Sequence, residues 1–256
     1  MTRSTSDSND FRPRRGRQMT RLETFTDAAF AFAVTLLAIS IDEIPNDYES
    51  LVTALKGAPA FAASFGLLLL YWRAHQNWSQ RYGLEDLPSV LLTFALVLVI
   101  MIYVYPLKIM FGAAFHFLSD GWLPSAFSLD SVHQFRVLVT IFGVGFFALS
   151  GLIAALYAYA WSKREALAMR PHESFDTGAE AIAWLLVGGF GLVSLTLGWL
   201  LPRETLHLAT WVYWALLVFG PVFDIAQRRL ARRRLPAAVA GSAAVTPGSG
   251  ADRNPD

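Results

Sequence analysis

Six long runs of apolar residues, separated by shorter polar stretches, organise this chain. They cover residues 22–41, 57–78, 88–111, 133–161, 179–200 and 206–227. Each run supplies the roughly 20 apolar residues that an α-helix needs to cross ~30 Å of hydrocarbon. None of them alternates apolar and polar residues with a period of two, so helices are favoured over a β-barrel. The pattern predicts an all-α membrane protein with six transmembrane helices per subunit, in one domain over residues 19–230.

The two ends of the chain lack this pattern. Residues 1–18 are rich in Ser, Asp, Arg and Pro, and residues 231–256 are mostly Arg, Ala, Gly, Ser and Pro. Neither end has enough apolar side chains to offset the entropy lost on folding. We expect both to be disordered tails. The stretch from Lys108 to Val132, between the third and fourth runs, is predicted to form a turn at the membrane interface.

The distribution of Lys and Arg predicts the orientation. If the N-terminus is cytoplasmic and six helices cross, the cytoplasmic segments hold 17 of the 21 basic residues. Cytoplasmic loops of membrane proteins carry such an excess of positive charge. The loop at residues 42–50 is acidic, which fits the outer side. The sequence therefore predicts a multi-pass protein of the cell membrane with both termini in the cytoplasm.

Composition narrows the function further. The chain has 256 residues, of which 54% are hydrophobic and 16% charged, whereas soluble domains carry about 25% charged residues. It has no cysteine, and its five histidines show no metal-ligand spacing. We find no nucleophile–base pair, phosphate-binding loop or catalytic carboxylate pair, so we expect no enzyme, no cofactor and no resident metal. The Arg-rich ends flank apolar helices, which favours a role in topology over nucleic-acid binding.

The first apolar run carries ionisable groups at its threshold. Arg21 precedes it and Asp27 lies just inside it, and charges at membrane depth usually mark function. On a helix with 100° per residue, Phe32, Leu36 and Ile39 share a stripe about 60° wide, while Asp27 lies about 140° from Phe32. One face could therefore line a space while Asp27 points to other helices. Ordinary contact with lipid or a neighbouring helix would give the same stripe.

The start of this run resembles a known signature. Arg21, Phe25, Thr26 and Asp27 match the Arg-x-x-x-Phe-Ser-Asp motif of the transmembrane protein 175 family of potassium channels, with Thr26 in place of Ser. An apolar helix containing Thr35-Leu36-Leu37 follows, as in that family. Further on, Trp72 stands three residues before His75, and Tyr105-Pro106 ends the third run, which both resemble the family pattern. The specific resemblance covers residues 21 to about 110.

The resemblance implies a pore. In that family the first helices of several subunits surround a central pore, which stacked apolar side chains close; these positions correspond to Phe32, Leu36 and Ile39 here. A threonine implicated in ion selection corresponds to Thr35. Phe32 departs from the aliphatic residue usual at the narrowest position. The resemblance further implies a homotetramer in the lipid bilayer through which potassium ions permeate.

Four polar residues are expected at a similar depth near the cytoplasmic side. The topology brings Arg21, Asp27, His75 and Asp86 to this level, where a polar network is feasible. Its simplest purpose is structural, since buried charges are tolerated when paired; involvement in ion passage or gating is the alternative. Thr93 stands where the family often has Asn.

The favoured hypothesis is a potassium-permeable cation channel that an apolar constriction on the first helix gates by excluding water. Two alternatives are compatible with the same residues. A proton-coupled secondary transporter would use Asp27 and His75 as a relay. A non-transporting membrane scaffold would use the Arg-rich tails to bind anionic lipid or partners.

Overall fold

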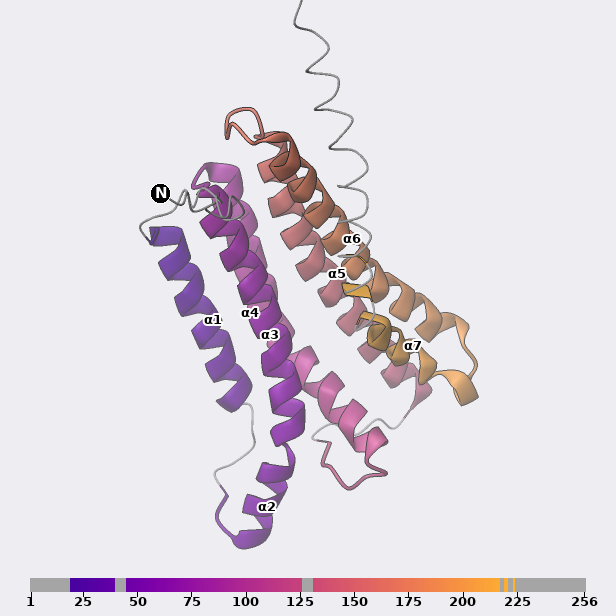
Figure 1. Cartoon of the computed structure of the whole chain (residues 1–256). Coiled ribbons are helices and arrows are strands. Elements are labelled where there is room, and N and C mark those ends of the chain that lie inside the picture. Colours follow the sequence, from indigo (N-terminus) through magenta and orange to yellow (C-terminus); the bar gives the residue numbers. More distant parts are fainter. Residues whose placement is uncertain (1–18, 40–44, 126–130, 217–218, 221–222, 224–256) are drawn as a thin grey trace, which may run out of the picture.

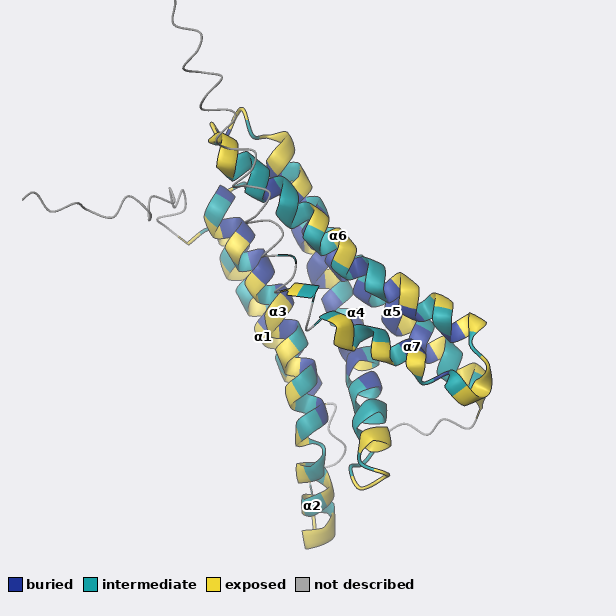
Figure 2. Ribbon diagram, turned by 45° about the vertical axis from the view of Figure 1, so that its right-hand side comes forward, coloured by how far each residue is buried: buried dark blue, intermediate teal, exposed yellow. Residues whose placement is uncertain are grey.

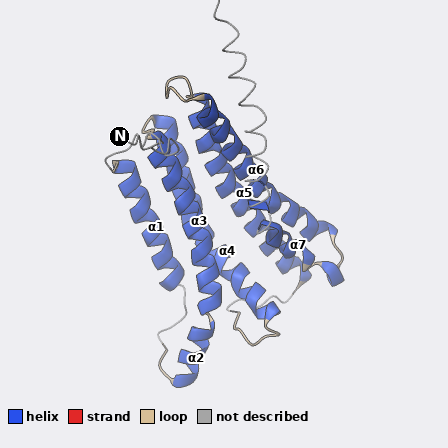
Figure 3. Ribbon diagram, viewed as in Figure 1, coloured by secondary structure: helices blue, strands red, loops and turns tan. Residues whose placement is uncertain are grey.

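The computed structural model describes residues 19–39, 45–125, 131–216, 219–220 and 223. Every regular element within these residues is a helix, as Figure 3 shows. The elements are α1 (Arg21–Ile39), α2 (Tyr48–Lys56), α3 (Ala58–Tyr82), α4 (Leu87–Leu118), α5 (Val132–Ser162), α6 (Pro171–Leu200), η1 (Arg203–Thr205), α7 (Leu208–Trp211) and η2 (Val212–Trp214). The predicted all-α class is therefore confirmed, while both predicted tails lie outside the described residues.

Five helical stretches are long and apolar enough to cross a membrane: Arg21–Ile39, Tyr48–Tyr82, Leu87–Leu118, Val132–Ser162 and Pro171–Leu200. They correspond to the first five predicted runs. The sixth run, 206–227, is described only in part, and that part consists of short helical turns such as α7 and η2. Since 217–218, 221–222 and 224–227 lie outside the described residues, the sixth span stays a prediction.

The third predicted span is longer than expected. We predicted a turn from Lys108, but α4 continues through Pro106 to Leu118 and the chain turns only at Ser119. Proline removes one backbone donor and bends a helix without ending it when apolar residues on the next turns remain buried. Leu107 and Met110 are buried here. After this point α4 turns away from α3, as its pink end in Figure 1 shows.

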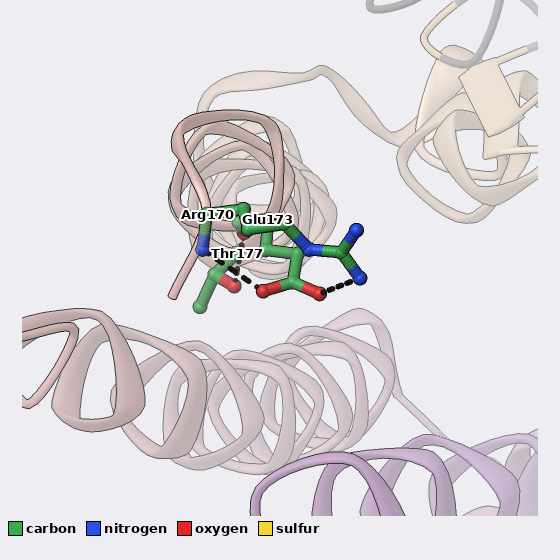
Figure 4. A network of polar contacts seen from close by, with 3 residues as sticks. All are labelled: Arg170, Glu173 and Thr177. Carbon is green, nitrogen blue, oxygen red and sulfur yellow. Dashed lines mark hydrogen bonds and ion pairs between the residues drawn. The ribbon is translucent and has the colours of Figure 1, made fainter. Parts of the chain in front are cut away.

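The fifth predicted span also starts earlier than expected, at Pro171 instead of residue 179. Proline is favoured at the first helical position. The side chain of Glu173 accepts a 3.0 Å hydrogen bond from the backbone N–H of Arg170, and their side chains form a 3.5 Å ion pair (Figure 4). Thr177 donates to the Glu173 carbonyl at 2.6 Å, and its hydroxyl bonds that of Tyr82 at 2.8 Å. Capping and packing therefore extend α6 at its N-terminal end by polar residues, which a search for apolar runs does not include.

The helices form two groups that meet along α3, α4 and α5. In Figure 1, α1 lies beside α3 and α4, whereas α6 and α7 lie on the other side of α5. Figure 2 shows the buried residues concentrated where the groups meet. Large side chains that are fully buried there include Tyr71, Trp78, Leu96, Leu149 and Leu156. This arrangement leaves α1 at the edge of the chain.

Glycines allow α5 and α6 to approach closely. A Cβ atom on Gly143 would lie 2.6 Å from the Gly191 carbonyl oxygen, so the two backbones touch at this crossing. Gly188 faces Phe147 and Ser150, and Gly198 faces Val139. Small residues at helix crossings permit the close van der Waals packing that stabilises helices in membranes.

Candidate pore helix and its polar supports

Helix α1 has one covered face and one open face. Its covered face carries Leu22, Thr26, Phe30, Ala33 and Leu37, all of which are buried. This face packs against α3 and α4. The spacing of these residues is the i, i+4, i+7 pattern of a single helix face. Thr26, at the motif position usually held by Ser, donates to the carbonyl of Leu22 at 2.7 Å and so satisfies its hydroxyl within the helix.

The open face carries the predicted gate residues. Phe32 is 57% exposed and Ile39 is 70% exposed, and Thr35 is exposed between them. Leu36 is half-buried and packs against the core at the edge of this face. The described part of the chain thus leaves most of the predicted stripe uncovered.

The hydroxyl of Thr35 has a defined orientation. It donates a 2.9 Å hydrogen bond to the carbonyl of Ala31, one turn earlier. Because the hydroxyl proton is used in this bond, the lone pairs of the oxygen point away from the helix and remain able to accept. An exposed oxygen acceptor on an otherwise apolar face is suited to contact a hydrated cation.

Phe25 occupies the position of the motif phenylalanine at the boundary between the two faces. Its ring lies 5.0 Å from that of Phe94 on α4, edge to face. This geometry is the favourable one for aromatic pairs. The contact holds the first turns of α1 against α4, although both rings remain partly exposed.

Asp27 is held by Trp72, the tryptophan that stands three residues before His75 in the family pattern. The indole nitrogen of Trp72 donates a 2.8 Å hydrogen bond to Oδ1 of Asp27, joining α1 to α3. Hydrogen bonds to a charged acceptor are about twice as strong as neutral ones. The half-buried carboxylate therefore fixes the rotation of α1 about its own axis relative to α3.

His75 has a different partner. Its Nε2 lies 3.0 Å from the hydroxyl oxygen of Thr93 on α4, and both side chains are buried. The ring also packs 5.8 Å from that of Trp78. A hydroxyl can donate or accept, so Thr93 can satisfy this imidazole nitrogen in its neutral form. The contact joins α3 to α4 one helical turn beyond the link between Asp27 and Trp72.

Asp86 lies just before α4 and joins it to α5. Its carboxylate accepts a 2.7 Å hydrogen bond from Ser89 and a hydrogen bond from the hydroxyl of Tyr159. Desolvation acts to raise the pKa of Asp86, but the hydrogen bonds from Ser89 and Tyr159 outweigh it and hold the pKa below its usual range.

The predicted polar group is thus a series of separate links. Arg21 is exposed at the start of α1, while Asp27, His75 and Asp86 bond Trp72, Thr93 and the pair Ser89–Tyr159. Among the described residues, no hydrogen bond joins any two of the four side chains that we expected to form one network. A network would have needed their side chains to converge, but they point to different neighbours.

Thr93 and Tyr159 are the partners that sequence reasoning missed. Thr93 could have been recognised as a hydrogen-bonding partner, because it places a hydroxyl group within the otherwise apolar third run. No sequence signal pointed to Tyr159, because it lies 73 residues after Asp86 and only the packing of α5 brings the two together. Among the described residues, no group of three or more His, Cys, Asp or Glu is placed to hold a metal ion.

Known proteins share the part of the chain that carries these contacts. The family model described as endosomal/lysosomal potassium channel TMEM175 matches residues 21–106, which contain α1, α2, α3, the first part of α4 and the links from Asp27 to Trp72 and from His75 to Thr93. A relative from Marivirga tractuosa, described as a potassium channel, is 32% identical over 230 residues, or 84% of this chain and 92% of the relative. The chain belongs to the TMEM175 family. The predicted resemblance is confirmed.

A solved structure agrees with this family. The fold is similar to the crystal structure of a variant of the potassium channel MtTMEM175 in complex with a nanobody–MBP fusion protein. The TM-score is 0.73 at 29% sequence identity, over 88% of this chain and 98% of that one. This TMEM175 family member is therefore a multi-pass membrane protein, and the likeness reaches well beyond the residues that carry the motif.

Proposed function

We propose that this TMEM175 family member is a potassium-permeable cation channel in which α1 lines a central pore. The open face of α1 is the observation that carries the proposal. Phe32, Thr35 and Ile39 are exposed on a helix at the edge of the chain, while the opposite face is packed and locked by Asp27 and Trp72. A helix that is held in place with its apolar face uncovered is ready to contact other copies around an axis.

A single copy cannot surround a pore with α1, so the proposal requires symmetric assembly. A homotetramer with closed rotational symmetry presents four α1 helices to one axis. Phe32, Leu36 and Ile39 then form stacked apolar rings, and a narrow apolar neck closes by losing its water. The exposed hydroxyl oxygen of Thr35 lies between the rings and provides a polar contact for the dehydrating ion.

The topology completes the proposal. Both termini are cytoplasmic and the protein resides in the cell membrane, with a channel domain over 19–230. The excess of Lys and Arg in the predicted cytoplasmic segments supports this orientation. Single-cysteine labelling with a membrane-impermeant reagent tests it, because the native chain has no cysteine. Labelling of a cysteine at Ser50 only from the cytoplasmic side would contradict it.

The contacts favour a channel over a proton relay. Asp27 bonds an indole N–H, which does not release its proton near neutral pH, and His75 bonds a hydroxyl on another helix. A relay would need a continuous path of exchangeable protons between the two.

Electrical recording tests the function directly. Purified protein in a planar bilayer should give unitary current steps that reverse near the potassium equilibrium potential in a potassium gradient, with less permeation of sodium. Saturable, gradient-coupled flux without unitary steps would indicate a transporter, and the absence of any flux would indicate a scaffold.

A further inference from the structure

A basic cluster lies where α5 begins and α6 ends. The guanidinium group of Arg136 on α5 donates a 3.1 Å hydrogen bond from Nη2 to the carbonyl of Leu201, the residue that caps the end of α6. Its carbon Cζ lies over the ring of Trp199, 5.9 Å from the ring centroid. The exposed His133, one turn earlier on α5, packs edge to face against the same indole at 6.1 Å. His133, Arg136 and Trp199 form what we name the basic corner.

The position of Trp199 is fixed by a further contact between the two helices. Its indole Nε1 donates a 2.9 Å hydrogen bond to the hydroxyl oxygen of Thr140, and that hydroxyl donates to the carbonyl of Arg136 at 2.8 Å. The indole ring and the Leu201 carbonyl together hold the guanidinium group in one place. The corner is therefore organised in advance, which reduces the entropy that binding a ligand would cost.

No acid neutralises the positive charge of Arg136. Among the described residues, no carboxylate forms an ion pair with it, not even the exposed Glu204 in the segment that follows α6. The Leu201 carbonyl supplies only the partial negative charge of a helix end. In this part of the chain Nε is buried without a hydrogen-bond partner, whereas Nη1 also lacks a partner but is not buried. A half-buried guanidinium group without a counter-ion favours an anion at its accessible edge.

The composition and length of α5 place this corner at the level of lipid headgroups. Helix α5 is long and apolar enough to cross a membrane, and Arg136, on its second turn, is its only Arg, Lys, Asp or Glu. Its 31 residues measure about 46 Å at 1.5 Å per residue, against ~30 Å of hydrocarbon. Because a charge at the centre of a bilayer is costly, the end that carries Arg136 lies at the headgroups, where an indole such as that of Trp199 is also favoured.

An exposed apolar strip leads away from the corner along α5. It consists of Val137, Ile141 and Val144, which are 37%, 48% and 52% exposed. Their i, i+4, i+7 spacing places them on one face of the helix, and His133 lies on the same face one turn before them. A cationic group at one end of an apolar strip is complementary to a ligand that joins an anionic group to a hydrocarbon chain.

We propose that the basic corner binds the headgroup phosphate of an anionic phospholipid, whose acyl chain lies along Val137, Ile141 and Val144. A guanidinium group presents its N–H donors in a geometry that suits phosphate oxygens. An anionic headgroup is favoured over a zwitterionic one, because Arg136 repels the ammonium group of the latter and has no acid beside it. The site lies on α5 and α6, whereas the proposed pore face lies on α1, so the two do not depend on each other.

Photolabelling tests the site in the full chain. Purified protein in detergent is irradiated with phosphatidylglycerol that carries a diazirine in one acyl chain, and adducts on residues 137–144 are quantified by mass spectrometry. Arg136→Gln removes the charge but keeps a donor for the Leu201 carbonyl, so labelling should fall at least about fivefold. Arg203→Gln removes an exposed arginine just after α6 and should leave labelling unchanged. Equal labelling of the two variants would overturn the proposal.

His133→Glu tests the site without removing the bond between Arg136 and Leu201. A carboxylate three residues before Arg136 on the helix would pair with the guanidinium group in place of the phosphate. Labelling should therefore fall by a similar factor, while His133→Gln should retain more of it. This pair of variants decides the matter if Arg136→Gln does not fold. Equal labelling of His133→Glu and His133→Gln would contradict the proposal.

Two further arms identify the ligand. Phosphatidylcholine with the same diazirine should label residues 137–144 at least about fivefold less than phosphatidylglycerol. An excess of inorganic phosphate, compared with chloride at equal ionic strength, should leave the labelling by phosphatidylglycerol in place, because free phosphate has no acyl chain to cover the strip. Equal labelling by the two lipids would show that the site does not select an anionic headgroup. Loss of labelling in inorganic phosphate would show that free phosphate is the ligand, and either result would overturn the proposal.

Discussion

The indole of Trp72 donates its hydrogen to the carboxylate of Asp27 across 2.8 Å, and this bond fixes which face of α1 is left open. The two residues are 45 positions apart. It acts together with the buried side chains of Leu22, Phe30 and Leu37, which pack the same side of α1 against α3 and α4. The orientation of the candidate pore face therefore depends on a contact on the opposite side of the helix.

The first prediction concerns this bond. Asp27→Ala and Trp72→Phe should each destabilise the folded oligomer by about 1.5–3 kcal/mol, because each removes a hydrogen bond to a charged group. The double variant should lose less stability than the sum of the losses in the two single variants, because both substitutions remove the same hydrogen bond. Thermal unfolding in detergent, followed by size-exclusion chromatography, measures this loss.

Trp161→Phe, at the exposed end of α5, is the control for loss of an indole and should be close to neutral. The contrary result is an Asp27→Ala protein that assembles with unchanged stability and differs only in permeation or pH response. That outcome would make the structural role wrong and would favour a proton relay.

The second prediction concerns the crossing of α5 and α6. Gly143→Ala should destabilise the protein by about 1–3 kcal/mol, because the added methyl group would lie 2.6 Å from the Gly191 carbonyl and force the helices apart. Gly189→Ala is the matched control on α6, since nothing lies within 4 Å of a methyl group there. That variant should be neutral or more stable by up to about 1 kcal/mol. Equal midpoints of thermal unfolding for the two variants would contradict the close crossing.

How well each helix could be predicted from the sequence depends on whether apolar residues or polar contacts determine its ends. Helix α5 was predicted to within one residue at each end, because its apolar run is uniform and Ser131 caps it. Helix α6 was predicted eight residues short, because polar capping and the contact between Thr177 and Tyr82 extend it. An apolar run therefore indicates the part of a helix that is able to cross lipid, and it misses turns that polar residues add to the helix.

The candidate site was predictable as a set of residues but not as a set of pairs. The motif marked Asp27, Trp72 and His75, yet their partners depend on the relative rotation of α1, α3 and α4. Helical spacing gives the face of each residue on its own helix only. Thr93 and His75 are 18 residues apart in sequence, and they pair because of the relative rotation of α3 and α4, which no local pattern encodes.

The third prediction concerns Asp86 and pH. Its pKa is lower in the folded protein than the usual value of 3.8, so its contacts with Ser89 and Tyr159 stabilise the fold fully above about pH 4. The stabilisation is lost as pH falls through the lowered pKa. Asp86→Asn should therefore reduce stability at pH 7 and remove part of the decline below pH 4. Unfolding midpoints from pH 3 to pH 8 test this, and an equally steep acid decline in the variant would contradict it.

The fourth prediction concerns the proposed gate. Phe32, Leu36 and Ile39 share one stripe of α1, so assembled copies would present them as stacked apolar rings. Leu36→Asn keeps a similar size but offers hydrogen bonds to water, which lowers the cost of wetting the neck. It should raise the basal potassium current in planar bilayers. Phe32→Asn should do the same, because this side chain is more exposed than Leu36.

The controls for the gate lie on the same helix at other angles. Asn at Ala29, about 60° from Phe32, should raise the current less, and Asn at Ala38, about 120° away, should change it little. Thr35→Val removes the hydroxyl at nearly constant shape, so it should reduce the preference for potassium over sodium while conduction persists. Equal effects at Leu36 and Ala38 would mean that α1 does not line the pore with this stripe. The ion path would then have to run along another face, and the open side of α1 would be a contact with lipid.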